Sequence, residues 1–205
     1  MTRLGVLVSG RGTNLQAILD ACADGRVAAA VAMVAGNRDC PALDIARAAG
    51  VPSVRVFTVP QFGNGRERDR AMAAALVEAG VELVVCAGYN RVIDDVLVEA
   101  FLGRIINVHP SLLPEFAGTM DAIHLAFEAG VPQTGVTVHM IEPGTVDAGI
   151  ILAQQVVPLL PGDSLDTLEA RVHGAEHELL PATIQALIQG RLPSALVPTR
   201  GEGRA

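Results

Sequence analysis

The chain has 205 residues, half of them apolar, so it can bury a substantial core and is not a disordered protein. Its formal net charge is −7 and it contains no run of basic residues, which argues against a nucleic-acid surface. All 15 basic side chains are arginine, so mechanisms that need a lysine, such as Schiff-base chemistry or a Walker-type phosphate loop, are excluded.

The first half of the chain alternates apolar, β-branched runs with segments of helical periodicity. We expect strands at 4–8, 27–35, 53–59 and 82–87, and helices at 15–22, 40–49 and 66–79. Strands that alternate with helices predict an α/β protein with a mostly parallel, Rossmann-like, doubly wound sheet.

The second half predicts a mixed end to this sheet. A helix is expected at 96–101, a strand at 104–108 and a helix at 121–129. Two apolar stretches, 135–141 and 150–158, flank a turn-rich loop and predict an antiparallel pair. A helix should run from 164 to about 177, with a further helix near 181–189. We therefore expect one domain over 1–190 and a loose tail over 191–205.

The cysteines and the N-terminal segment bear on location and partners. Cys22, Cys40 and Cys86 are far apart in sequence and predict no disulfide framework. The apolar run near the N-terminus is too short for a signal peptide or a membrane span. We expect a cytoplasmic protein that binds neither membrane nor nucleic acid, and a monomer and a homodimer are both compatible with the sequence.

A glycine-rich turn, GRGTN at 10–14, separates the first expected strand from the first expected helix. Free backbone N–H groups and the positive end of a helix dipole favour an anion such as phosphate at this place. The third glycine of a dinucleotide-binding fingerprint is missing, because Leu15 stands there. An ordinary turn with Thr13 or Asn14 as the helix cap is an equally good interpretation of the turn alone.

The strand at 104–108 leads directly into polar residues. Alternation along a strand places Asn107 and His109 on one face at its carboxyl end, where open α/β sheets hold their ligands. Pro110 and Pro114 restrict the chain that follows. Taken alone, the segment is better explained by an asparagine and a histidine that satisfy buried backbone groups.

Asp147 is the natural third partner, because it lies in the loop between the two apolar stretches. As a single residue it is also a typical turn former. With Asn107 and His109 it makes an acid/base and oxyanion-donor set that lacks a nucleophile, which favours direct acyl transfer to an amine. A metal site formed by His109, His139 and Asp147 matches no known ligand spacing, so no metal is expected.

Four segments occur in the order SGRGTNLQ (9–16), AGYNR (87–91), NVHPSLLP (107–114) and VDAG (146–149). In this order and spacing they resemble the phosphoribosylglycinamide formyltransferases, which are folate-dependent enzymes of purine synthesis. The resemblance covers roughly 3–191. Asn90 stands where this family usually has methionine, and the 115–121 stretch is one residue longer than its common form.

The resemblance implies two small-molecule substrates, phosphoribosylglycinamide and the co-substrate 10-formyltetrahydrofolate. It implies that Gly12, Thr13 and Asn14 bind the phosphate, and that Glu176 contacts the ribose or the glycinamide. The catalytic residues would be Asn107, His109 and Asp147, with Asn107 also anchoring the formyl group. The folate pocket would be lined by Arg66, Asn90, Arg91, Val92 and Ile93.

The expected reaction is direct attack of the glycinamide amine on the formyl carbon, without a covalent enzyme intermediate. Asn107 and His109 would stabilise the oxyanion, and Asp147 would relay a proton towards the leaving folate nitrogen. Three alternatives remain open from the sequence: a formyltetrahydrofolate hydrolase, a non-catalytic nucleotide- or folate-binding protein, and a metal-dependent hydrolase.

Overall fold

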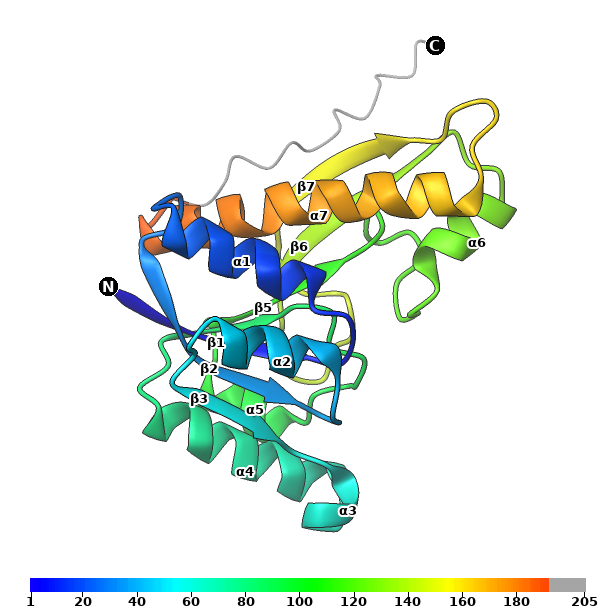
Figure 1. The fold of residues 1–205 in the computed structure, drawn as a ribbon. Helices are drawn as coiled ribbons and strands as arrows, with labels where there is room; N and C mark the ends of the chain where they lie inside the picture. The colour runs from blue at the N-terminus through cyan, green and yellow to red at the C-terminus, as the bar shows by residue number, and fades with distance from the viewer. Residues whose placement is uncertain (192–205) are drawn as a thin grey trace.

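A computed structural model describes residues 1–191 of the chain and shows one seven-stranded sheet in the order β3-β2-β1-β4-β5-β6-β7 (Figure 1). The first five strands are parallel, whereas β6 and β7 run antiparallel to their neighbours. The predicted α/β sheet with a mixed C-terminal part is thereby confirmed. The strands are β1 (Thr2–Val8), β2 (Ala29–Gly36), β3 (Ser53–Val56), β4 (Leu83–Cys86), β5 (Ile105–His109), β6 (Gln133–Met140) and β7 (Ile151–Pro158).

Helices cover both faces of the sheet, as Figure 1 shows: α1, α2 and α7 lie on one side, and α4 and α5 on the other. The alternation within β1 explains why both faces are apolar. Leu4 and Val6 belong to the core under α1 and α7, whereas Leu7 belongs to the core under α4. The helices are α1 (Thr13–Ala23), α2 (Pro41–Ala48), α3 (Val59–Phe62), α4 (Gly65–Glu78), α5 (Asp95–Ala100), α6 (Ala122–Glu128) and α7 (Leu165–Ile188).

The strand order creates a cleft at the carboxyl edge of the sheet. The chain leaves β1 towards β2 on one side, and β4 pairs with β1 on the other side. The loops that follow β1 and β4 therefore diverge, and ligands of open α/β sheets bind at such a switch point. The loop after β5 lies beside them, because β5 pairs with β4.

Two predictions of secondary structure were wrong. The helices expected at 164–177 and 181–189 form the single helix α7, which contains Pro181. Pro181 removes one helical hydrogen bond, but it is buried, and the packing of α7 on α1, β6 and β7 compensates for the loss. The strand expected at 53–59 ends at Val56, and Val59–Phe62 forms the short helix α3 with Pro60 in its first turn, where a missing N–H costs little.

The tail predicted at 191–205 lies, apart from Arg191, outside the described residues. Within residues 1–191, no helix has the length and apolar character needed to cross a membrane.

Candidate active site

A cavity of about 480 Å³ opens at the carboxyl edge of β1, β4 and β5, which is within the usual size range of small-molecule sites. It extends from the N-terminus of α1, past the end of β5, to the loop before β7. All the predicted site residues except Arg66 line it: Gly12, Thr13, Asn14, Asn90, Arg91, Val92, Ile93, Asn107, His109, Asp147 and Glu176.

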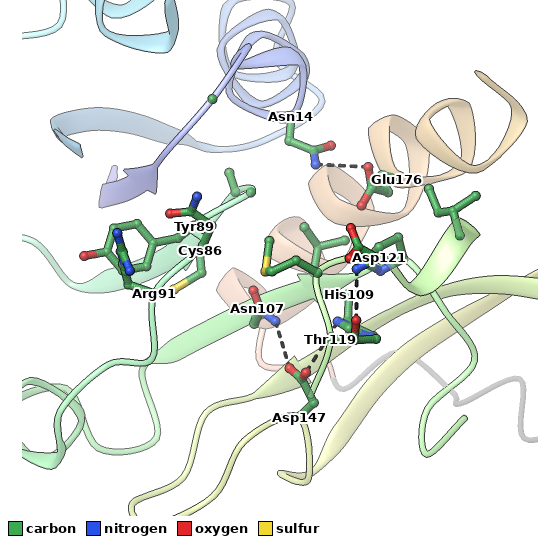
Figure 2. A pocket seen from close by; sticks show the side chains of 18 of the residues that line it. Asn14, Cys86, Tyr89, Arg91, Asn107, His109, Thr119, Asp121, Asp147 and Glu176 are labelled. Carbon is green, nitrogen blue, oxygen red and sulfur yellow. Dashed lines mark hydrogen bonds and ion pairs between the residues drawn. The ribbon is translucent and has the colours of Figure 1, made fainter. Parts of the chain in front are cut away.

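The centre of the cavity holds Asn107, His109 and Asp147, whose side chains point toward one another in Figure 2. Asp147 Oδ1 accepts from Asn107 Nδ2 at 3.4 Å, and Asp147 Oδ2 lies 3.5 Å from His109 Nδ1. Asn107 and His109 are alternate residues of β5 and so share one face. The sequence therefore brings an amide donor, an imidazole and a carboxylate to one point, as predicted.

A second imidazole joins this cluster. His139 on β6 stands directly opposite Asn107 in the antiparallel register. Its Nε2 lies 3.2 Å from Asn107 Nδ2 and 3.4 Å from Asp147 Oδ1, and its Nδ1 donates to the carbonyl of Met140 at 3.0 Å. One ring nitrogen of His139 thus lies beside both the Asn107 amide and the Asp147 carboxylate, from the side of β6.

The geometry of His109 assigns a role to each ring nitrogen. Its Nε2 lies 2.9 Å from the carbonyl oxygen of Phe116, and since a carbonyl can only accept, Nε2 carries the hydrogen. The Nδ1 atom then faces the Asp147 carboxylate. A proton taken up by Nδ1 would therefore lie between His109 and Asp147.

The chain after His109 is fixed by a buried polar network from β6 and β7. Leu113 N donates to Thr137 Oγ1 at 3.0 Å, and the Thr137 hydroxyl donates to the Ser111 carbonyl at 2.7 Å. Gln154 Nε2 donates to the Leu113 carbonyl at 3.0 Å. Because Thr137 is paired with His109 in the sheet, this network holds the exit of β5 in register with the cluster of Asn107, His109 and Asp147.

Asp147 lies in the loop between β6 and β7 with a φ of 50°, a left-handed conformation that is uncommon for a residue other than glycine. Burial raises the pKa of its carboxyl, but the hydrogen bond from His139, the N–H of Gly118 at 2.9 Å and the charge of His109 outweigh burial and lower the pKa below its ordinary value. Asp147 is therefore a carboxylate at neutral pH.

The N-terminus of α1 forms the other end of the cavity. Its N-cap is Gly12, with a φ of 85° and no side-chain cap hydrogen bond. The alternative interpretation, in which Thr13 or Asn14 caps the helix, is therefore wrong. A Cβ at Gly12 would lie 2.7 Å from the Ala42 Cα, so only glycine fits this turn. The N–H groups of the first turn have no intrahelical partners and face an anion-binding position.

Side chains from α7 complete this end. Glu176, which is buried, accepts from Asn14 Nδ2 at 3.2 Å and from His173 Nδ1 at 2.8 Å (Figure 2). His173 Nε2 lies 3.3 Å from an Arg11 guanidinium nitrogen. The hydrogen bond to Glu176 raises the pKa of His173, although burial and the Arg11 charge oppose the shift. Arg11 thus adds positive charge beside the helix N-terminus, and protonation of His173 would add a second positive charge there.

Asn90, Arg91, Val92 and Ile93 form the opposite wall of the cavity. Asn90 N donates to Ser9 Oγ at 2.9 Å, and Asn90 Oδ1 accepts from Asn37 at 2.9 Å. Arg66 does not line the cavity: its guanidinium donates to Asp94 Oδ1 at 3.1 Å from the solvent-exposed start of α4.

Among residues 1–191, no group of three or more histidine, cysteine, aspartate or glutamate side chains is arranged to hold a metal ion. Two side chains beside the N-terminus of α1, Arg11 and His173, were not predicted as site residues from the sequence. His139 was considered only as a metal ligand. The alternation of residues along a strand does not give the register between β5 and β6. It also does not show that Arg11 and His173 are in contact.

Comparison with known proteins identifies the family. A family model described as formyl transferase matches residues 2–184. Phosphoribosylglycinamide formyltransferase of Haemophilus influenzae is 40% identical over 94% of this chain and 90% of its own length. The trifunctional purine biosynthetic protein adenosine-3 of Homo sapiens is 40% identical over 92% of this chain, which spans only 18% of that protein.

A solved structure agrees with both relatives. The crystal structure of glycinamide ribonucleotide transformylase 1 from Symbiobacterium toebii is 43% identical and superposes with a TM-score of 0.88, covering 93% of this chain and 89% of that one. Sequence and fold therefore match over nearly the same residues, and these residues include the whole cavity. The chain belongs to the formyl transferase family of enzymes.

Proposed function

We propose that the chain transfers the formyl group of 10-formyltetrahydrofolate to the amine of phosphoribosylglycinamide, in purine biosynthesis. The observation that carries this proposal is one cavity with the Asn107, His109 and Asp147 cluster at its centre and an anion-binding helix terminus at one end. A phosphorylated amine bound at that terminus extends towards the cluster. The names of the relatives favour the same formyl acceptor and the same transferred group.

The phosphate of the ribonucleotide is bound in this proposal by Gly12, Thr13 and Asn14, with Arg11 and His173 supplying charge. Glu176 lies next to Asn14, where a carboxylate can accept hydrogen bonds from the ribose hydroxyls or the glycinamide. These groups orient the amine and leave its reaction to the centre of the cavity.

The folate is received by the Asn90 to Ile93 wall and the Asp147 loop. Val92 and Val146 line the cavity, and both side chains are exposed. The ring system of the bound folate would pack against these two apolar side chains. Because Arg66 points to Asp94 instead, its contact with folate stays a prediction.

In the proposed reaction the neutral amine attacks the formyl carbon, and the new C–N bond forms as the bond from that carbon to the folate nitrogen breaks. Asn107 Nδ2 and His109 donate to the oxyanion, each donor contributing about 3 kcal/mol. The proton lost by the amine passes to the folate nitrogen, with Asp147 as its carrier and water as a bridge where needed. No covalent intermediate with the enzyme is required.

His109 reaches the oxyanion through Nε2, since Nδ1 faces Asp147. In the free protein Nε2 donates to the Phe116 carbonyl, so the substrate oxygen must replace this partner. Phe116 has a φ of 54°, in the left-handed region, so its present conformation is a costly one for a non-glycine residue. Exchange of one acceptor for another keeps the imidazole hydrogen-bonded throughout.

The direct test is formyl transfer by the purified protein, measured as tetrahydrofolate appearance with and without the ribonucleotide. Turnover that depends on the ribonucleotide is the expected result. Turnover that is equal without it would identify a formyltetrahydrofolate hydrolase and overturn the proposal. Binding of both compounds without turnover would favour a non-catalytic binding protein.

The affinity for the ribonucleotide is expected to fall with rising pH. Because the pKa of His173 is raised, its positive charge is present below the ordinary value and is lost as the pH rises through the raised pKa. Phosphate binding should weaken about threefold to fivefold across this loss of charge. Glu176, Glu169 and Arg11 also face the imidazole. Burial lowers the pKa of the neighbouring His177, so His177 loses its charge at a lower pH than His173.

Equilibrium titration of the wild type and of His173→Gln with the ribonucleotide measures this effect. Glutamine keeps a hydrogen-bonding side chain but has no charge, so the variant should lack the wild type's additional pH dependence. The comparison cancels the titration of the ligand's own amine and phosphate. Identical pH profiles for the two proteins would show that the His173 charge is not used in binding.

A further inference from the structure

A buried ion pair lies behind the Asn90 to Ile93 wall and takes no part in the proposed chemistry. Arg68 Nε donates to Asp69 Oδ1 at 2.6 Å, and the two side chains are only 4% and 1% exposed. Burying two charges costs solvation free energy, and replacing such pairs with apolar residues is often stabilising. The stability of the fold therefore does not explain why this ion pair is buried, and the pair is expected to serve another role.

The contacts of the pair are with the backbone of the cavity wall. The second carboxylate oxygen, Asp69 Oδ2, accepts from Asp94 N at 2.7 Å. An Arg68 guanidinium nitrogen donates to the Val92 carbonyl at 3.4 Å. One buried pair thus holds both a donor and an acceptor of the segment that lines the cavity.

The other end of this segment is held in the same way. Asn90 N donates to the hydroxyl of Ser9, a side chain only 2% exposed at the end of β1. Between these two fixed points Arg91, Val92 and Ile93 line the cavity without helix or strand structure. The shape of this part of the wall is therefore set by buried side chains at its two ends, and Val92 is left 71% exposed toward an incoming ligand.

We propose that Arg68 and Asp69 are positioning residues that fix the 90–94 segment in the conformation that receives the folate. The pair then controls the affinity for 10-formyltetrahydrofolate, and not the chemical step or the binding of the ribonucleotide, whose phosphate position lies at the other end of the cavity. This inference rests on the proposed function, because it names the folate as the ligand of that wall.

Asp69→Asn is the sharpest test. The carboxylate accepts from Arg68 and from Asp94 N at once, whereas an amide has one acceptor oxygen and directs its NH₂ group at the other donor. We expect KM for 10-formyltetrahydrofolate to rise about tenfold. The kcat value and KM for the ribonucleotide should stay within about twofold of the wild type.

Glu67→Gln is the matched control. Glu67 lies on the same turn of α4 and forms an ion pair with Arg70 at 2.6 Å, but both side chains are exposed. Like Asp69→Asn, the substitution Glu67→Gln removes one carboxylate charge from α4. All the kinetic constants of this variant should equal those of the wild type, so that any effect of Asp69→Asn is not an effect of net charge.

Ser9→Ala tests the same proposal without disturbing the buried pair, and it decides the matter if Asp69→Asn fails to fold. It removes the acceptor for Asn90 N, and the same selective rise in KM for the folate is expected. Hydrogen exchange gives a readout that needs no activity: the Asp94 amide should exchange faster in folded Asp69→Asn than in the wild type. Unchanged exchange there would contradict the assigned contact.

An equal rise in both KM values, or a lower kcat with an unchanged KM for the folate, would show a general structural role and overturn the positioning proposal. A wild type that binds the non-reactive 5-formyltetrahydrofolate but transfers no formyl group would instead refute the proposed function. In that case the dissociation constants of wild type, Asp69→Asn and Ser9→Ala for this compound still test the positioning role. A wild type with no folate binding at all would overturn both.

Discussion

Replacing His109 with alanine is expected to lower kcat about 10³-fold while the fold and the ribonucleotide affinity are retained. The imidazole lies between the Asp147 carboxylate, which faces Nδ1, and the proposed position of the oxyanion, which is reached through Nε2. Its removal deletes an oxyanion donor and the imidazole that faces the proposed proton carrier, Asp147. Binding of the phosphate depends on a different end of the cavity and should not change.

The measurement is single-turnover formyl transfer with both substrates saturating, accompanied by a thermal melt and a ribonucleotide titration of the variant. His109→Gln is the informative companion, because glutamine offers an N–H donor but cannot carry the proton. It should recover part of the oxyanion stabilisation and remain at least tenfold slower than the wild type. Turnover near the wild-type value in either variant would remove His109 from the mechanism.

The central part of the site was predictable because it depends on local patterns. A strand followed by a glycine-rich turn and a helix locates Gly12, Thr13 and Asn14, and alternation along β5 places Asn107 and His109 on one face. The turn-rich loop between two apolar stretches suggests Asp147, and the family resemblance adds Glu176 from a distant segment. All of these residues line one cavity.

The groups that were missed depend on pairings that no local pattern contains. His139 meets Asn107 only because β5 and β6 pair in one particular antiparallel register. Arg11 and His173 meet across the packing of α1 against α7, and they are 162 positions apart in sequence. Arg68 and Asp69 are buried and contact backbone groups of Val92 and Asp94, which follow them by 24 and 25 positions in sequence.

Helix α7 shows the same limit for secondary structure. Proline disfavours the interior of a helix, since it lacks the N–H and its ring crowds the preceding turn. A break in the helix before Pro181 is therefore the expected result. The prediction fails because Leu180, Pro181 and Ile184 are buried, so the packing of an uninterrupted helix offsets the missing hydrogen bond. Burial of this kind is a property of the tertiary structure.

Replacing Asp147 with asparagine is expected to lower kcat about 10²-fold to 10³-fold, with little change in either KM. Asparagine has nearly the same shape, and its oxygen can still accept from Gly118 N, so the loop should keep its conformation. What is lost is the charge that faces His109 and the site that carries the proton. Activity within threefold of the wild type would exclude Asp147 as the proton carrier.

A stability measurement separates the charge of Asp147 from its shape. Because the pKa of Asp147 is lowered in the folded protein, its ionised form stabilises the fold above the ordinary value of 3.8, and this contribution is lost as the pH falls through the lowered pKa. Asp147→Asn should therefore melt at a lower temperature than the wild type at pH 7, and the difference should shrink on acidification below about pH 4. A variant that melts like the wild type at both pH values but has lost activity would show that the carboxylate serves the reaction alone and contributes nothing to the fold.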